Sequence, residues 1–303
     1  MPLDAGELDS RIQKLRKSLK GFSRNPTVEQ VHDLRTRTRR VESIFQSLDM
    51  ASSGKERKLL GELKRVRKRA GKVRDMDVLT SHVIGLGLDE DAECVVRLAH
   101  HLGVVRYRNA RKLHAEVRQH TGRVRDRLQR SRRKLDAAID GFGKTKLDLG
   151  TQAVDAEEAP LHAISEALRL SRELAAVRHL GRDNLHPYRI EVKRLRYILE
   201  MAESDGRQQH TLIAELKEVQ DLIGEWHDWV QLSGIAHKVL KQHNGCKLLK
   251  KIEQTTRRKF EEALRAAERV RQQYLQRQRK TGGRARRWFA PGPVLVAASE
   301  IAA

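Results

Sequence analysis

The chain has 303 residues and a formal net charge of +22, because 62 lysines and arginines face only 40 aspartates and glutamates. A protein this basic repels itself, so a polyanionic partner is expected: nucleic acid, an anionic membrane surface or a polyphosphate. Cys94 and Cys246 are too few and too isolated for a disulfide framework or a metal site, and they suit a reducing compartment. Neither a signal peptide nor a membrane span is expected, because the first 15 residues contain no apolar stretch and no run of about 18 apolar residues occurs.

Helices are expected along nearly the whole chain, because only 6 prolines occur and apolar residues recur with a helical period. Thr27 and Gln30 have the spacing of a capping box at the start of the second helix. Gly85 and Gly87 mark a turn, and Thr121-Gly122 is expected to separate two helices. In chain order, the expected helices span about 3–20, 27–48, 55–84, 90–119, 122–141, 160–180, 184–203, 208–241 and 246–280. The fold class is therefore all-α.

The chain is expected to form two similar helical units that together make one domain. The N-terminal unit spans residues 1–142 and the C-terminal unit spans residues 161–280. Residues 143–160 have the composition of a linker, and residues 281–303 form a tail. The apolar part of this tail, residues 288–296, is short and interrupted by prolines, which indicates a docking tail or a disordered end.

A charged motif occurs twice, each time followed by a second motif on the next helix. The first copy consists of His32, Arg35, Arg39 and Arg40, followed by Lys64, Arg67, Gly71, Arg74 and Asp75. The second copy consists of His186, Arg189, Lys193, Arg194 and Arg196, followed by Lys217, Gln220, Gly224, His227 and Asp228. The copies lie about 150 residues apart in the same order, which indicates duplication of a whole unit.

Read on helices, each motif becomes a stripe of positive charge. Residues at i, i+3 and i+7 share one helix face, so His32, Arg35 and Arg39 line up. Like charges at this spacing repel by a few tenths of a kcal/mol each, which is relieved if the stripe faces a chain of phosphates. Asp75 and Asp228 are expected to orient an arginine at the far end. Four other carboxylates are expected to lie near the stripes but largely off them: Asp33, Glu42, Glu191 and Glu200.

Gly71 and Gly224 hold the same place in the two copies. Glycine inside a helix costs about 1 kcal/mol relative to alanine, so a structural reason is expected at both positions. The spacing predicts either a close approach of another group to the backbone or a kink in the helix.

The motifs VHDLRTRTRR, GKVRDMDVL, LHPYRIEVKRLRY and LKEVQDLIGEWHD resemble those of the CHAD family, the conserved histidine α-helical domain. The resemblance extends over roughly residues 3–241. It implies two four-helix bundles related by pseudo-twofold symmetry, and a central basic groove or pore that binds inorganic polyphosphate without catalysis. The chain looks like a stand-alone CHAD protein. It departs from the family at His227, and Val230 stands where the first copy has Asp77.

Three functions remain in competition at this point. Polyphosphate binding fits a cationic groove in a chain with only 4% aromatic residues, because single-strand nucleic-acid binders offer aromatic stacking platforms. Weak nonspecific nucleic-acid binding is expected from charge alone. A phosphohydrolase would need a cluster of acidic metal ligands or an activated nucleophile, and neither is visible. We therefore expect no enzyme, no catalytic residue, no cofactor and no metal, in a cytoplasmic protein that associates with polyphosphate granules. His32 and His186 are either phosphate donors or helix-packing residues.

Overall fold

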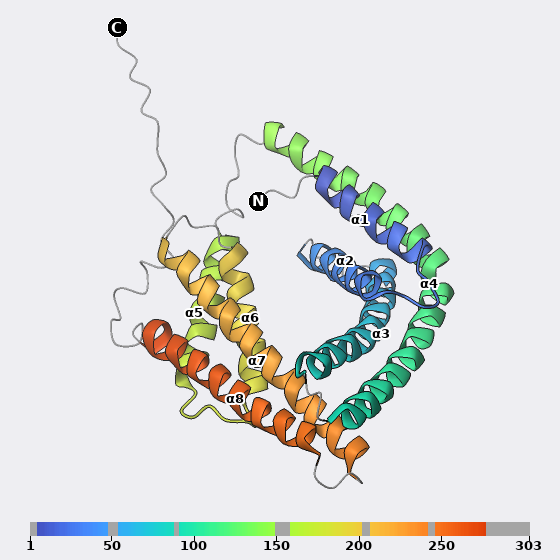
Figure 1. Cartoon of the computed structure of the whole chain (residues 1–303). Helices are drawn as coiled ribbons and strands as arrows, with labels where there is room; N and C mark the ends of the chain where they lie inside the picture. The colour runs from blue at the N-terminus through green and yellow to red at the C-terminus, as the bar shows by residue number, and fades with distance from the viewer. Residues whose placement is uncertain are drawn as a thin grey trace. The chain divides into compact units, whose positions relative to one another are not determined.

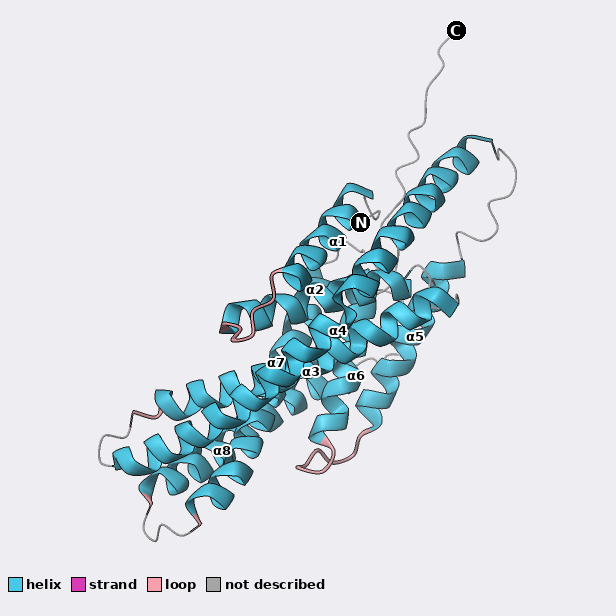
Figure 2. Ribbon diagram, turned by 90° about the vertical axis from the view of Figure 1, so that its right-hand side faces the viewer, coloured by secondary structure: helices cyan, strands magenta, loops and turns pink. Residues whose placement is uncertain are grey.

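The computed structural model describes residues 5–47, 54–87, 91–148, 158–201, 207–241 and 246–276. None of these residues lies in a strand, as the ribbon in Figure 2 shows, so the all-α expectation is confirmed. The helices drawn in Figure 1 are α1 (Ala5–Lys20), α2 (Val28–Ser47), α3 (Gly54–Gly85), α4 (Ala92–Asp148), α5 (Glu158–Ala176), α6 (Leu185–Met201), α7 (Arg207–Leu240) and α8 (Lys247–Val270), which continues into a π-helical turn (Arg271–Gln276).

The chain divides into two compact units. The first contains residues 1–151 and 235–249, and the second contains residues 152–234 and 250–303. Helices α1–α4 therefore belong to the first unit, while α5, α6 and most of α7 and α8 belong to the second. The described residues of the expected linker are helical, since α4 runs to Asp148 and α5 begins at Glu158. The expected tail at 281–303, with its apolar segment, lies outside the described residues.

The core of the first unit is built from one apolar face of each of its four helices. Helix α3 packs along α4, α2 packs on α3, and α1 packs on both α2 and α4. The buried side chains of this core come from all four helices and include Ile12, Leu15, Val31, Leu34, Phe45, Leu63, Val66, Ala70, Val73, Leu113, Val117 and Leu128. Their burial leaves the charged faces of α2 and α3 free to carry other chemistry.

The second unit has a separate core of the same kind. Its buried side chains come from α5, α6, α7 and α8 and include Leu170, Leu174, Leu185, Tyr188, Val192, Leu195, Leu216, Val219, Ile223, Trp226, Ala263 and Val270. The tryptophans of α7, Trp226 and Trp229, are both buried, as a packing role requires. The burial of these residues leaves the polar faces of α6 and α7 outside the core.

Two local features of the first unit agree with the sequence. The backbone N–H of Gln30 donates to Thr27 Oγ1 over 3.2 Å, and the N–H of Thr27 donates to Gln30 Oε1 over 3.1 Å. This reciprocal pair is a capping box, which satisfies two backbone donors at the start of α2. After α3, Gly87 has a φ of 55°, a left-handed conformation that favours glycine.

The expected break at Thr121-Gly122 is wrong, because α4 is one continuous helix of 57 residues. The hydroxyl of Thr121 donates to the backbone carbonyl of Val117 over 2.6 Å, so this residue remains part of the helix. Val117 and Val124 are buried on either side of Gly122. The packing of these flanking residues offsets the cost of about 1 kcal/mol for a glycine inside a helix.

The two cysteines are far apart in the sequence but are neighbours in the structure, and both are free. The thiol groups of Cys94 and Cys246 share a hydrogen bond, and both side chains are buried in the first unit. Near them, the carboxylate of Asp91 accepts a hydrogen bond from the backbone N–H of Leu248 at the start of α8. A carboxylate at a helix N-terminus satisfies a donor that has no partner within the helix, so Asp91 caps the start of α8.

Candidate anion-binding stripes

The N-terminal stripe lies on α2 and α3 of the first unit. It consists of His32, Arg35, Arg39 and Arg40 on α2, and Lys64, Arg67 and Arg74 on α3. His32, Arg40 and Lys64 are exposed, whereas the other four are half-buried. The neighbouring apolar faces, with Val31 and Leu34 on α2 and Val66 and Ala70 on α3, turn inward and hold the two helices together.

Arg35 lies at the centre of this stripe. Burial lowers the pKa of Arg35, and the positive charges of Arg39, Arg67 and Arg74 lower it further, while Asp75 acts in the opposite direction. The structure thus brings cations from both helices together around one guanidinium group. Among the described residues, Arg35 has no ion pair. The negative charge of Asp75 favours the charged form of Arg35.

A buried carboxylate neutralises Arg67 in this stripe. Its Nε donates to Glu42 Oε2 over 2.5 Å. Glu42 therefore lies near the stripe, as expected, and in addition contacts one of its arginines directly. Burial raises the pKa of Glu42, and the charge of Arg67 opposes that rise. The two residues lie on different helices, so sequence spacing gave no signal of their contact.

The C-terminal stripe lies on α6 and α7 of the second unit. It consists of His186, Arg189, Lys193, Arg194 and Arg196 on α6, and Lys217, Gln220 and His227 on α7. Its buried neighbours, Leu185 and Val192 on α6 and Val219 on α7, belong to the second core. His186, Arg194 and Lys217 are exposed and the other members are half-buried.

Arg189 is held in place by the helix opposite it. Its Nε donates to the backbone carbonyl of Gln220 over 2.8 Å. A β-carbon at Gly224 would lie 2.8 Å from Arg189 Nη2, so only glycine leaves room for the guanidinium group in this position. No described residue forms an ion pair with Arg189. The side chain is therefore positioned by the backbone of α7 while its charge stays available.

The same pairing of arginine and glycine occurs in the first unit, with a looser fit. A β-carbon at Gly71 would lie 4.0 Å from Arg35 Nε, which is an ordinary van der Waals contact. Of the two explanations that the sequence left open for the duplicated glycines, the contacts support close approach at Gly224. At Gly71 the neighbour is also an arginine, Arg35, but a β-carbon would not clash with it.

The second unit has a pair of histidines, His186 and His227, where the first unit has one histidine and one arginine. The rings of His186 and His227 are stacked with their centroids 5.0 Å apart. Gln231 Nε2 lies 3.0 Å from Nδ1 of His227 and fixes that ring. Burial lowers the pKa of His186, and the charges of His227 and Arg189 lower it further. The first copy has Arg74 in place of His227, so the C-terminal stripe contains two imidazole groups and the N-terminal stripe contains one.

Three members of the C-terminal stripe have partners on their own helix. Arg194 pairs with Glu191, and Arg196 pairs with Glu200. The ring of Tyr197 lies under both Lys193 Nζ, at 5.5 Å, and the guanidinium of Arg196, at 4.8 Å. Arg194 and Arg196 are therefore less available to a ligand than Arg189, and Tyr197 is a neighbour that the sequence reasoning missed. Its spacing of four residues from Lys193 was the signal that could have revealed it.

The described residues contain no group of three or more side chains that could hold a metal ion. None of the helices in the described ranges is long and apolar enough to cross a membrane. The two stripes offer positioned guanidinium, ammonium and imidazole groups, which bind anions by charge and hydrogen bonds.

The sequence and structure of this chain were compared with those of known proteins. A crystal structure of the CHAD domain from the plant Ricinus communis is similar, with 18% sequence identity, 94% of this chain and 89% of that chain covered, and a TM-score of 0.49. No curated protein matched the chain. The family model described as the CHAD domain matches residues 7–237, which include every residue of both stripes. Because this match covers well over half of the sequence, the chain belongs to the CHAD domain family.

Proposed function

We propose that this protein binds inorganic polyphosphate through the N-terminal and C-terminal stripes and catalyses no reaction. The CHAD family is linked in general to polyphosphate binding. The observation that carries the proposal is the repeated arginine–glycine pairing: in each unit, an arginine without an ion pair among the described residues lies against the opposite helix. An arginine positioned before the ligand arrives loses less conformational freedom on binding.

The chemistry of the ligand supports the same assignment. A polyphosphate chain is flexible, carries about one charge for each phosphate, and has no base that needs a stacking partner. The stripes offer cations from two helices in each unit, with Lys64 and Lys217 adding exposed positive charge. Arginine binds phosphate oxygens through a planar fork, and lysine contributes a more mobile point charge.

The finer features of the proposal come from the family resemblance. We propose that the two units are four-helix bundles related by pseudo-twofold symmetry, and that both stripes line one groove. If one polyphosphate chain occupies both stripes, the losses of binding free energy caused by substitutions in the two stripes will not be additive in a double-mutant cycle. Additive losses and a stoichiometry of two chains would contradict the shared groove but leave polyphosphate binding intact. A cytoplasmic location on polyphosphate granules belongs to the same proposal, and imaging of a tagged protein together with a granule stain tests it.

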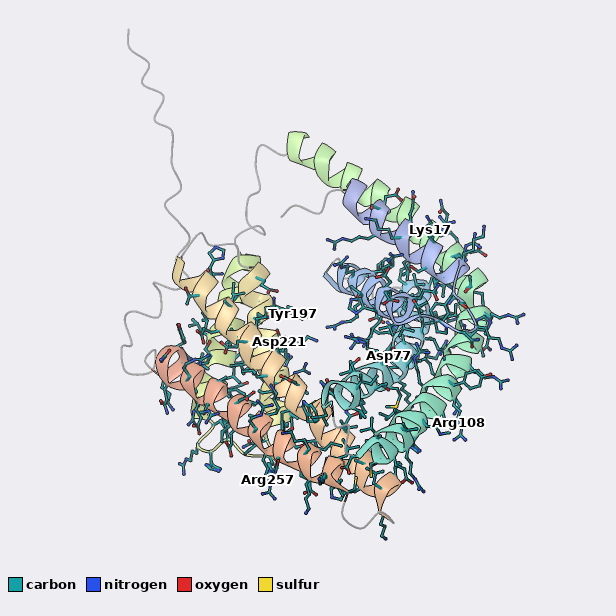
Figure 3. All side chains as sticks on the ribbon, in the orientation of Figure 1. Lys17, Asp77, Arg108, Tyr197, Asp221 and Arg257 are labelled. Atoms are coloured by element: carbon teal, nitrogen blue, oxygen red, sulfur yellow. The ribbon has the colours of Figure 1, made fainter. Side chains whose placement is uncertain are left out.

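The central test neutralises the two positioned arginines. We expect the Arg35→Gln/Arg189→Gln variant to lose about a hundredfold in affinity for long-chain polyphosphate at about 0.15 M salt, since hydrogen bonds between charged groups contribute about 1.5–3 kcal/mol each. The matched control is Arg108→Gln/Arg257→Gln, which removes one exposed arginine from each unit and the same total charge (Figure 3). Equal losses in the two variants would show that net charge, and not the stripes, accounts for binding.

Nonspecific nucleic-acid binding is the second candidate, because the net charge of +22 favours any polyanion. A competition experiment at equal phosphate concentration separates the two functions. If single-stranded DNA displaces long-chain polyphosphate at physiological salt, the polyphosphate assignment fails.

The absence of catalysis is tested separately from binding. The protein is incubated with long-chain polyphosphate and Mg²⁺, and free phosphate and chain length are followed over time. Release of phosphate that disappears in the Arg35→Gln/Arg189→Gln variant would make the protein a phosphohydrolase and overturn the non-catalytic assignment.

A further inference from the structure

The first unit has a basic pocket that shares no residue with the stripes. It has a volume of about 480 Å³ and is lined by Arg24, Arg111, His114, Ala115, Arg118 and Gln119. Arg111, His114 and Arg118 lie on α4 at positions i, i+3 and i+7, so they share one face of the helix. Arg24 comes from the segment between α1 and α2. Two elements far apart in the sequence therefore supply its cations.

The positive charge of this pocket is not balanced by neighbouring carboxylates. Among the described residues, Arg24, Arg111 and Arg118 form no ion pair, and no acidic residue lines the pocket. Other arginines of α4 do have such partners: Arg106 pairs with Asp77, and Arg127 pairs with Glu62. Three guanidinium groups around one concavity repel one another, and an anion inside it would relieve that repulsion.

The segment that carries Arg24 is fastened to α4. Arg106 Nη2 donates to the backbone carbonyl of Pro26 over 2.9 Å, while its Nε donates to the buried Asp77 of α3, which Figure 3 labels. Phe22 and Pro26, on either side of Arg24, are also buried. The pocket therefore has two walls that are joined before any ligand binds, which lowers the entropic cost of binding.

We propose that this pocket binds an oligophosphate group, meaning two or three linked phosphates. Three arginines match the charge of such a group, and their planar donors suit its oxygens. His114 adds a ring whose Nδ1 has no hydrogen-bond partner among the described residues. No aromatic ring other than this imidazole lines the pocket, so it offers no platform for a nucleobase. The group can belong to a free short oligophosphate or to a polyphosphate chain.

The test is a calorimetric titration of the full chain with inorganic tripolyphosphate. We expect the Arg111→Gln/Arg118→Gln variant to bind tripolyphosphate at least about tenfold more weakly than the unmodified chain, because two charge-assisted contacts are lost. The control variant, Arg108→Gln/Lys112→Gln, removes the same charge from exposed positions of α4 outside the pocket and should bind normally. Arg24 lies outside the helices, so Arg24→Gln leaves α4 unchanged. This variant should also weaken tripolyphosphate binding, and it keeps the test valid if the α4 variant unfolds.

The outcomes separate this site from the stripes and identify the source of the phosphate. Equal weakening in the pocket variant and its control would overturn the proposal, as would loss of tripolyphosphate binding only in the Arg35→Gln/Arg189→Gln variant. If the pocket variant also binds long-chain polyphosphate more weakly, the pocket holds part of that chain. If only tripolyphosphate binding weakens, the pocket takes free short oligophosphates. Since no residue is shared with the stripes, the site can be supported even if the proposed function fails.

Discussion

The guanidinium group of Arg189 occupies the space in which Gly224 would otherwise carry a side chain. A β-carbon there would lie 2.8 Å from Nη2 and 3.4 Å from Nε of the arginine, and that Nε already donates to the carbonyl of Gln220. In the first unit, Arg35 approaches Gly71 in the same way, but a β-carbon would lie 4.0 Å from its Nε. The pairing of arginine and glycine thus occurs in both units, with a closer fit in the second.

Alanine at the two glycines is expected to have different effects. Gly71→Ala should raise the free energy of unfolding by up to about 1 kcal/mol, because it removes a helix-interior glycine without a clash. Gly224→Ala should displace the Arg189 guanidinium, gain little stability and weaken polyphosphate binding by about tenfold. Chemical denaturation and binding titrations of both variants check this. Equal binding by the two variants would mean that the position of Arg189 does not matter for the ligand.

Removing charge from the stripes is expected to leave the fold intact. Neutralising Arg35, Arg39, Arg189 and Lys193 together should abolish polyphosphate binding while the melting temperature stays the same or rises. Burial and neighbouring cations already lower the pKa of Arg35, so its charge is unfavourable in the free protein. Circular dichroism and thermal melting provide the measurement. A large loss of stability would assign the stripes a structural role.

Arg67 is expected to behave in the opposite way, because it neutralises a buried carboxylate. Arg67→Gln leaves Glu42 without this partner and should lower the free energy of unfolding by about 1–3 kcal/mol at neutral pH. The double variant Arg67→Gln/Glu42→Gln should recover most of that loss. Urea denaturation of both variants measures the difference, and no destabilisation by the single variant would show that the ion pair contributes nothing.

Polyphosphate binding is expected to tighten as pH falls from about 8 to 6. Burial, His227 and Arg189 lower the pKa of His186 in the free protein, so the ring is mostly neutral at pH 7. A bound phosphate raises that pKa, and binding therefore takes up a proton. The lowered pKa also means that the unfolded chain holds this proton more tightly, so the stability of the unliganded protein falls as pH decreases through about 6.5.

The histidine origin of this pH dependence can be isolated with one variant. His186→Asn/His227→Asn should reduce the dependence of affinity on pH between about 6 and 8, because the variant removes both stacked imidazole rings from the C-terminal stripe. Binding titrations at several pH values make the comparison. The same slope in the variant and the unmodified chain would exclude both rings from contact with the ligand.

The buried cysteines are expected to be unreactive in the folded protein. Burial raises the pKa of the Cys94 thiol, and its hydrogen bond with Cys246 raises it further, so little thiolate forms at neutral pH. Labelling with a thiol-specific reagent should be slow under native conditions and complete for both cysteines in denaturant. Fast labelling of two thiols in the native protein would contradict the contact and the burial.

The helical class, the capping box of Thr27 and Gln30 and the duplicated motifs were all open to prediction from the sequence. Each depends on spacing within one segment: the 3.6-residue apolar period, a separation of three residues, or an ordered motif. The cationic faces of α2 and α6 followed from the same periodicity, because a helix turns residue spacing into a face.

Only the tertiary structure decided which charges remain available. Glu42 neutralises Arg67, the α7 backbone holds Arg189, and Cys94 meets Cys246 through contacts between elements far apart in the sequence. The continuity of α4 through Gly122 and the pocket beside Arg24 depend on packing in the same way. Local propensity and periodicity carry no information about such contacts, because their energies arise only when separate helices come together.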